Sequence, residues 1–284
     1  MILDLDIKDY HNRSEISSTV LKAALVSQAH LHLVLSGKMK TSKSMILGDA
    51  VHAFILQPNR FDEMYETIRE VYLRNTGEHK AGDAKLDADG EPIVMLKHKT
   101  DSSLDIKGDD YKKFTAMISA YTSSYEATEL VKSAKFVETS FIFNNLRVRP
   151  DFITEDGWIV DLKTVGGTMD KPSAPERFGR DFFDYGYDLQ MYMYYNVVKK
   201  ELPNIKGFKF LCLDAKIPSG VQIYTFVDGE SKWFELGGYR FHEAMCQLDR
   251  YQDNIEHKVY DIETPSDLPL SYQAEEYLVK MRAK

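Results

Sequence analysis

The pattern of apolar and polar residues in the middle of the chain predicts three consecutive strands. Residues 136–143 and 146–153 are both rich in β-branched, aromatic and leucine side chains. Asn144 and Asn145 separate these runs, and two asparagines suit a two-residue hairpin turn because Asn tolerates positive φ. A second turn at residues 155–157 contains a glycine and leads directly into a third apolar run. We therefore predict a three-stranded antiparallel meander.

The two turns also predict which residues face each other across these strands. Counting outward from the first turn places Glu138 opposite Asp151, and counting from the second turn places Asp151 opposite Asp161. Because side chains alternate between the faces of a strand, the three carboxylates share one face with Lys163. A one-residue bulge would change this register. The polar face also takes Arg147 and Arg149, and the apolar face takes Leu146, Val148, Pro150, Phe152, Trp158, Val160 and Leu162.

A cluster of carboxylates on one face of a sheet has two interpretations. Like charges directly opposite each other destabilise a sheet, and a bound cation reverses the sign of that effect. Oxygen ligands suit Mg²⁺ or Mn²⁺, and the backbone carbonyl of Leu162 is a further candidate ligand. Lys163 could then orient an attacking water or a scissile phosphate. The alternative is an amphipathic hairpin with a solvated charged face, which the pattern by itself favours equally.

The rest of the chain is predicted to be mainly helical, with two further strands. The order of elements predicts an α/β fold with a mixed sheet covered by helices. We predict a single domain over 1–284, with 75–108 as a flexible insertion and 255–284 as a peripheral tail. Helices are predicted over 14–34, 44–57, 109–132, 185–202 and 231–254, strands over 207–215 and 221–227, loops over 75–108 and 166–181, and a loop with a short helix beyond 260.

The composition is that of a soluble globular protein in a reducing compartment. The chain has 284 residues, of which 43% are hydrophobic and 28% are charged, which is enough for a substantial core. No stretch approaches the ~20 apolar residues of a membrane span, and the charged N-terminus does not resemble a signal peptide. Cys212 and Cys246 are the only cysteines, which excludes a disulfide framework and a four-cysteine iron–sulfur cluster. These features favour a cytoplasmic location.

The net charge of −8 argues against nucleic acid as a partner, because phosphate contacts usually come from a basic surface. Net charge, however, does not say where individual charges lie. A local basic groove beside the acidic cluster is compatible with an acidic protein, so the candidate site carries more weight than the total charge. Basic residues close to the cluster in sequence are Arg147, Arg149, Lys163, Lys171, Arg177 and Arg180.

Four segments of the chain resemble a known nuclease family. They are ISSTVLK (16–22), LGDAVHAFILQP (47–58), VRPDFITEDGWIVDLKT (148–164) and DLQMYMYY (188–195), and they occur in the expected order. On these motifs the chain resembles the PD-(D/E)xK nuclease superfamily. Within it, the chain is similar to the RecE-type branch, the exonuclease VIII catalytic domain of phage-derived recombination systems. The resemblance implies a nuclease core with a mixed sheet flanked by helices.

The resemblance implies particular roles for the acidic cluster and its neighbours. Asp151 and Asp161 match the two metal-binding acids of the superfamily, and Lys163 matches its catalytic lysine. Glu138 matches an acidic position found less uniformly in related nucleases. His52 matches a histidine that reaches the metal site, whereas a lone helical histidine is more often a satisfied core residue.

The resemblance also implies residues that contact the substrate. Gln190 and Tyr194 match a QxxxY element, in which the glutamine contacts the substrate strand or orients the lysine. Tyr194 could instead belong to an aromatic packing stripe. Ser17 and Lys22, with the neighbouring Ser18, match an element near the path of the terminal phosphate, although a plain helix cap is equally compatible. Arg177 is a further candidate for contact with the DNA backbone.

The activity that the resemblance implies is 5′→3′ digestion of linear duplex DNA, with one or two Mg²⁺ or Mn²⁺ ions, to leave a 3′ single-stranded tail. It also implies a ring-like homo-oligomer such as a tetramer. The implied partner is a RecT-like single-strand annealing protein, in the cytoplasm of a bacterial or phage-infected cell. Two alternatives remain: an endonuclease or single-strand-specific nuclease with the same site, and a non-catalytic DNA-binding protein on the same fold.

Overall fold

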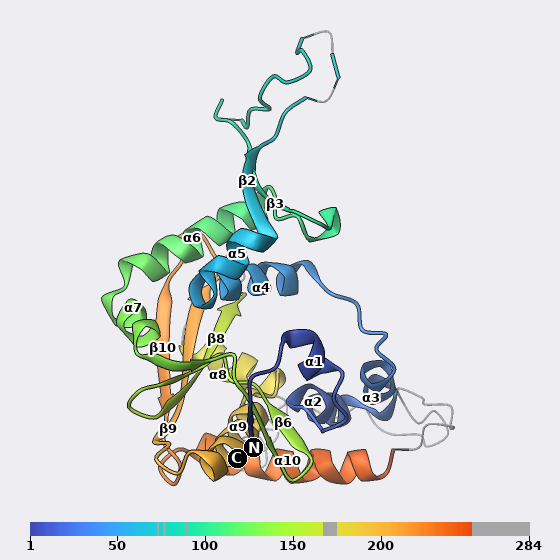
Figure 1. Cartoon of the computed structure of the whole chain (residues 1–284), viewed down its shortest axis with the longest axis vertical. Helices are drawn as coiled ribbons and strands as arrows, with labels where there is room; N and C mark the ends of the chain where they lie inside the picture. The colour runs from blue at the N-terminus through green and yellow to red at the C-terminus, as the bar shows by residue number, and fades with distance from the viewer. Residues whose placement is uncertain (73, 76–77, 89, 167–174, 252–284) are drawn as a thin grey trace, which may run out of the picture.

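A mixed five-stranded sheet forms the centre of the protein in a computed structural model (Figure 1). The structure describes the chain except for residues 73, 76–77, 89, 167–174 and 252–284. The strands lie in the order β10-β9-β8-β7-β4, and β8 pairs with β9 in parallel while the other neighbours are antiparallel. The bounds are β4 (Ala134–Val137), β7 (Phe152–Thr154), β8 (Trp158–Val165), β9 (Gly207–Asp214) and β10 (Val221–Phe226).

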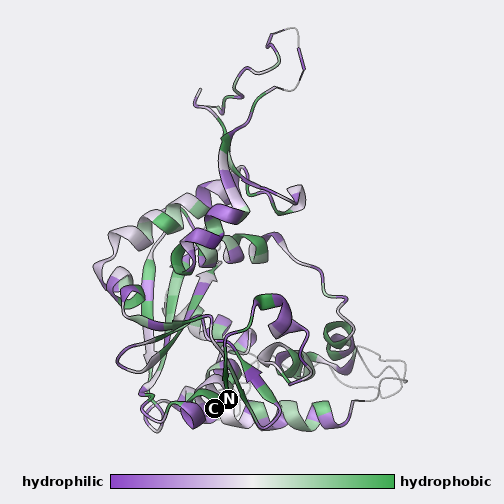
Figure 2. Cartoon of the chain, in the orientation of Figure 1, coloured by the Kyte–Doolittle hydropathy of each residue, from purple (hydrophilic) through white to green (hydrophobic). Residues whose placement is uncertain are grey.

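Helices cover both faces of this sheet, and each face has its own hydrophobic core. Figure 2 shows that hydrophobic residues are concentrated on the strands. The predicted class, a mixed sheet flanked by helices, is confirmed. None of the described helices has the length and apolar character that a membrane span requires. One face packs against α4 (Lys43–Leu56), α5 (Pro58–Met64), α6 (Asp109–Ser123) and α7 (Tyr125–Lys132), and the other against α2 (Ser18–Val26), α8 (Pro175–Asp184), α9 (Tyr187–Glu201) and α10 (Lys232–Asp249).

The predicted register of the hairpins is confirmed. Asn144 and Asn145 have φ values of 48° and 60°, and Phe143 pairs with Leu146 beside them. Gly157 in the second turn has a φ of 93°. The residues that supply positive φ therefore set the register, as their conformational preferences predict. Further along these strands the pairs follow the same count: Val137 with Phe152, Phe152 with Val160, and Ile153 with Ile159.

The prediction of one continuous apolar face was wrong, because the first hairpin is divided between two sheets. β5 (Ser140–Phe143) and β6 (Leu146–Val148) leave the central sheet and form a second sheet with β1 (Ile2–Leu3). Val148 consequently packs in the core that contains α9, whereas Phe152 packs in the core that contains α4. The chain therefore changes sheets between these two residues, which is the stretch that contains Asp151.

Several helices end where a serine caps the next helix. The helix predicted over 14–34 is divided at Ser27 into α2 and α3 (Gln28–Leu35), and the Ser27 hydroxyl accepts a hydrogen bond from the His30 N–H at 3.1 Å. Ser124 likewise separates α6 from α7 within the helical region predicted over 109–132. The α4 and α9 helices and strands β9 and β10 agree with their predictions to within two residues at each end. Serine caps account for the interruptions because they satisfy the free N–H groups of a helix start.

Two further differences from the predicted elements concern the loop predicted over 166–181 and the end of the last predicted long helix. The loop predicted over 166–181 was wrong from Pro175 onward, where α8 begins, and proline is favourable at such a position. The last described helix, α10, ends at Asp249 rather than at 254. The predicted tail beyond residue 260 lies outside the described residues.

A two-stranded ribbon projects from the body of the protein (Figure 1). It consists of β2 (Tyr65–Arg69) paired with β3 (Val94–His98), and a short helical turn, η1 (Ser102–Leu104), follows. The loop predicted over 75–108 was therefore wrong for β3 and η1.

Candidate active site

The candidate site lies where the chain passes from one sheet to the other. Asp151 occupies this crossing between β6 and β7, and Asp161 and Lys163 lie on β8. His52 comes from α4, and Gly48 one turn before it allows the helix to approach β8 closely. A Cβ at Gly48 would lie only 3.3 Å from the Thr164 hydroxyl oxygen. The parallel pairing of β8 and β9 requires a crossover, which places α9 and Gln190 over the opposite face of the sheet.

Three of the predicted metal ligands come together. His52, Glu138 and Asp151 each offer a ligand atom, and these atoms all lie within 4.8 Å of one another. His52 Nδ1 is 3.6 Å from Asp151 Oδ1, and the N–H of Leu162 donates to Asp151 Oδ2 at 2.5 Å. One imidazole and two carboxylates form a donor set that suits a hard divalent cation such as Mn²⁺ or Mg²⁺.

Asp161, the fourth predicted ligand, has both carboxylate oxygens engaged by side chains. Oδ1 accepts a hydrogen bond from Gln190 Nε2 at 2.7 Å, and Oδ2 forms an ion pair with Lys163. Asp161 is only 3% exposed, so its charge depends on these partners.

Burial and repulsion between carboxylates make the site favourable for a cation. Burial raises the pKa of Asp151 well above its ordinary value, and the charges of Asp161 and Glu138 raise it further. Burial lowers the pKa of His52, and the charge of Lys163 lowers it further, so the imidazole keeps a free electron pair for a metal. Burial opposes the charge on Lys163, but Asp161, Tyr187 and Asp151 raise its pKa above the ordinary value, so its ammonium group stays protonated.

Glu138 has a strained backbone, and Arg149 holds its carboxylate in place. The sequence did not predict this role for Arg149. Glu138 has a φ of 50°, in the left-handed region that is unfavourable for a residue with a side chain. Its N–H donates to the Asp151 carbonyl at 2.9 Å, and its Oε2 accepts from Arg149 Nε at 2.8 Å. Arg149 is anchored in turn by the Leu5 carbonyl, 2.7 Å from Nη1, and by the Ser140 hydroxyl. The predicted register placed Arg149 on the same face as Glu138. The structure shows that the two side chains form an ion pair beside the bend at Glu138.

We expect Arg149→Met to weaken divalent-metal binding by roughly 10- to 100-fold, because the support of a metal ligand is lost. Glu138 would keep its charge and lose the group that orients it. Calorimetric titration with Mn²⁺ measures the change. Arg60→Met is the matched control, since Arg60 is exposed on α5 and donates only to Gln57 within the described contacts. Equal affinities of Arg149→Met and the wild type would show that Glu138 does not take part in binding.

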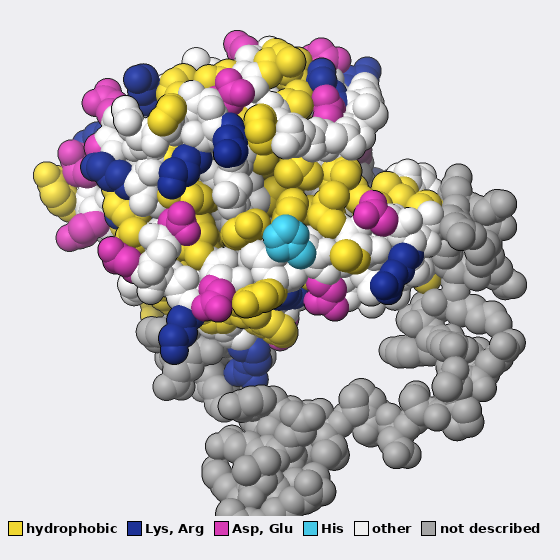
Figure 3. Space-filling view, turned by 90° about the horizontal axis from the view of Figure 1, so that it is seen from below, with side chains coloured by type: hydrophobic (Ala, Val, Ile, Leu, Met, Phe, Trp, Pro, Cys, Tyr) yellow, Lys and Arg dark blue, Asp and Glu magenta, His cyan; other side chains and the backbone are white. Residues whose placement is uncertain are grey.

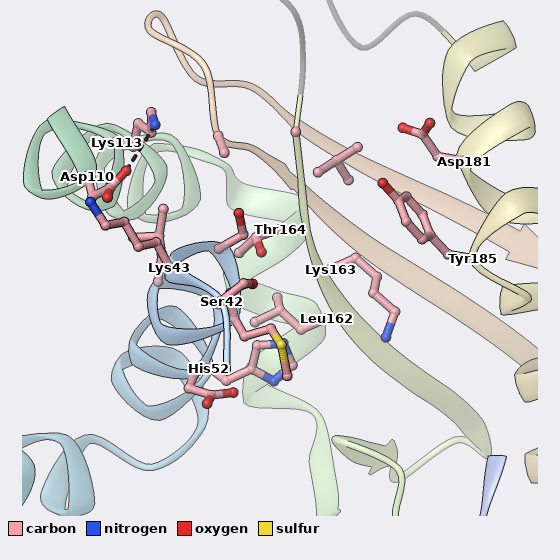
Figure 4. A pocket seen from close by; sticks show the side chains of 18 of the residues that line it. Ser42, Lys43, His52, Asp110, Lys113, Leu162, Lys163, Thr164, Asp181 and Tyr185 are labelled. Carbon is pink, nitrogen blue, oxygen red and sulfur yellow. Dashed lines mark hydrogen bonds and ion pairs between the residues drawn. The ribbon is translucent and has the colours of Figure 1, made fainter. Parts of the chain in front are cut away.

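Two cavities meet at this cluster. The α4 cavity, of about 790 Å³, is lined by His52, Lys163 and Tyr185. Figure 4 shows His52 on one side of β8 and the side chains of Lys163 and Tyr185 on the other. The α2 cavity, of about 720 Å³, is lined on the other side by Glu138, together with basic and hydroxyl side chains. These include Arg13, Ser17, Ser18, Arg147, Arg149 and Tyr194. His52 lines one cavity and Glu138 lines the other, so the His52–Glu138–Asp151 cluster lies between the two.

The predicted substrate residues have different surroundings in the structure. Ser17 is the N-cap of α2, its side chain makes no capping hydrogen bond, and it lines the α2 cavity. Tyr194 is only 8% exposed, and its hydroxyl hydrogen-bonds the Ser18 side chain at that cavity. Lys22 contacts Gln190 at 2.5 Å. Arg177 lies in α8, and its side chain is outside the described part of the structure.

A mixed sheet flanked by helices, with acidic residues on or next to adjoining strands, is the PDDEXK-like nuclease fold. A family model described as "PDDEXK-like domain of unknown function (DUF3799)" matches residues 17–260, and the chain belongs to this family. A crystal structure from Eubacterium rectale described as a "putative exonuclease" superimposes with a TM-score of 0.60 at 13% sequence identity, over 95% of this chain and 97% of that chain. This likeness shows the fold. Among curated proteins, none matches the chain.

Proposed function

We propose that this protein is a divalent-metal-dependent exodeoxyribonuclease that acts on the ends of linear double-stranded DNA. The observation that carries the proposal is the His52–Glu138–Asp151 cluster next to the protonated Lys163, at the junction of two cavities. The family of PDDEXK-like domains supports phosphodiester hydrolysis, and the description of the Eubacterium rectale structure supports an exonuclease.

The residues of the site would have different roles in phosphodiester hydrolysis. His52, Glu138 and Asp151, with Asp161 beside them, would hold one or two divalent ions. Such ions, when bound, polarise the phosphate and lower the pKa of an attacking water. Lys163 keeps its ammonium group at the edge of the cluster, where it stabilises negative charge that develops on the phosphate.

The α2 cavity supports recognition of a DNA end. The Ser17 side chain makes no capping hydrogen bond at the start of α2, so the helix N-terminus and the Ser17 hydroxyl together favour a phosphate. Arg147 also lines this cavity, is 8% exposed, and has a buried Nε without a hydrogen-bond partner among the described residues. Glu138 lines this cavity as well, so a terminal phosphate bound in it would lie close to the His52–Glu138–Asp151 cluster. This placement favours stepwise removal from an end over cleavage within a duplex.

The likeness to RecE-type nucleases extends the proposal to polarity and partners. Digestion would run 5′→3′ with Mg²⁺ and leave a 3′ single strand for a RecT-like annealing protein, in the cytoplasm and as a ring-like homo-oligomer. Figure 3 shows basic side chains interspersed with acidic ones over the visible part of one face. DNA is therefore expected to enter through the cavities rather than across that face.

The deciding experiment compares 5′-phosphorylated linear duplex DNA with covalently closed plasmid, in Mg²⁺ and in EDTA. We expect metal-dependent loss of the linear DNA only, and none with Lys163→Ala. Substrate without the 5′-phosphate should be degraded more slowly if the α2 cavity receives that group. Nicking of the closed plasmid would identify an endonuclease instead. Binding of both DNAs without cleavage would identify a non-catalytic protein on the same fold.

A further inference from the structure

We propose that Lys22 is a positioning residue of the active site, which acts on Asp161 through the side-chain amide of Gln190. The proposal rests on the nuclease function proposed above. It differs from the expectation that Lys22 contacts the terminal phosphate.

A chain of two hydrogen bonds joins α2 to β8. Lys22 Nζ donates to Gln190 Oε1 at 2.5 Å, and Gln190 Nε2 donates to Asp161 Oδ1 at 2.7 Å. An ammonium group has only donors and a carboxylate has only acceptors, so the amide between them can satisfy both in a single orientation. Asp161 requires the amide nitrogen to face it, and Lys22 holds the amide oxygen at the other end, so the two partners together fix the Gln190 side chain.

The surroundings of Lys22 hold it in this place. Its Nζ lies 5.0 Å from the centre of the Tyr187 ring, and Lys163 Nζ lies 4.9 Å from the centre of the same ring. Gly186, with a φ of 64°, packs against the Lys22 stem, and a Cβ there would lie 3.1 Å from Lys22 Cγ. The lysine stem thus packs against the start of α9. Lys22 is absent from the lining of both large cavities, which agrees with a target inside the protein.

The two lysines act on different oxygens of Asp161. Lys163 pairs with Oδ2, and Lys22 secures Oδ1 through Gln190. Without Lys22, the Gln190 oxygen would lose its donor, and the side chain could move away from Asp161. Asp161 would then be held by Lys163 alone and would lose its fixed position beside the His52–Glu138–Asp151 cluster. Burial and the charge of Lys163 lower the pKa of Lys22 to about 7, and the neutral amine still donates to the Gln190 oxygen, because the Asp161 carboxylate keeps the amide nitrogen on its own side.

A double-mutant cycle tests this pathway. Lys22→Met and Gln190→Leu are each expected to lower kcat on linear duplex DNA by roughly 10- to 100-fold, with KM nearly unchanged. Because both remove the same connection, Lys22→Met should cost little further activity in the Gln190→Leu background. Multiplying effects, or a raised KM with an unchanged kcat, would show that Lys22 binds DNA directly and would overturn the proposal. Lys132→Met, exposed on α7, is the control lysine.

A second measurement does not depend on catalysis. The side-chain NH₂ signals of Gln190 in an NMR spectrum can be identified by their loss in Gln190→Leu. They are expected to shift in Lys22→Met and to stay in place in Lys132→Met. If the wild type cleaves no DNA, the proposed function fails while this measurement still tests the contact. Unmoved signals in a folded Lys22→Met protein would overturn the inference in either case.

Discussion

Asp151→Asn is expected to abolish DNA cleavage, by a factor on the order of 10³ or more, and at the same time to stabilise the metal-free protein. Asp151 belongs to the His52–Glu138–Asp151 cluster, and its Oδ2 accepts a hydrogen bond from the Leu162 N–H. Without metal, its charge is opposed by burial and by Asp161 and Glu138. A neutral amide of the same shape removes that repulsion, so the free energy of unfolding should rise by roughly 1 kcal/mol.

The pH dependence of this stabilisation has a defined sign. The pKa of Asp151 is raised in the folded protein, so between a pH of about 4 and that raised pKa the folded state holds a proton that the unfolded state has lost. The stability contributed by Asp151 is therefore lost as the pH rises through this window. The difference in stability between Asp151→Asn and the wild type should be near zero at about pH 4 and should grow towards neutral pH.

Urea unfolding in EDTA across this pH range, with calorimetric Mn²⁺ titration at neutral pH, measures both effects. Asp228→Asn provides a matched control, because Asp228 is exposed and lies 3.8 Å from Lys199. We expect the control to retain its activity and to show little change in stability. A loss of stability in Asp151→Asn at neutral pH would mean that the hydrogen bond to Leu162 outweighs the repulsion, and the site would then be structural.

Lys163→Ala is the second substitution with a large expected effect, and it should separate metal binding from catalysis. Cleavage should fall by a factor on the order of 10³, because the positive charge beside the developing phosphate charge is lost. The affinity for Mn²⁺ should stay the same or increase, since the ammonium group repels a cation. Asp151→Asn should instead lose both activity and metal affinity.

The metal-free Lys163→Ala protein should also be less stable, by roughly 3 kcal/mol, because Asp161 loses its buried counterion. Mn²⁺ should restore part of this stability. Lys132→Ala removes an exposed ion pair with Glu129 and should change stability by less than about 1 kcal/mol. Thermal unfolding with and without Mn²⁺ distinguishes these outcomes. Reduced Mn²⁺ affinity in Lys163→Ala would indicate that the lysine organises the ligands rather than the reacting phosphate.

The conformational preferences of the turn residues were enough to predict part of the site from the sequence. Asn144, Asn145 and Gly157 favour positive φ, and from these turns the pairing of the strands follows by counting. That count predicted the proximity of Glu138 and Asp151, which the hydrogen bond from the Glu138 N–H confirms. The φ preferences of turn residues affect only a few neighbouring positions, so the turns can be predicted without knowledge of the rest of the chain.

Long-range packing set how the first hairpin is divided between two sheets and which side chains surround Asp161. The left-handed Glu138 and the change of sheets at Asp151 depend on packing between two cores, which periodicity does not report. The contacts of Asp161 with Gln190, and of Gln190 with Lys22, join residues separated by 29 and 168 positions. Such contacts arise from the crossover that places α9 over the sheet and from the packing of α2 against it. The turns determined which acids lie close together, and the long-range packing placed Gln190 and Lys22 behind Asp161.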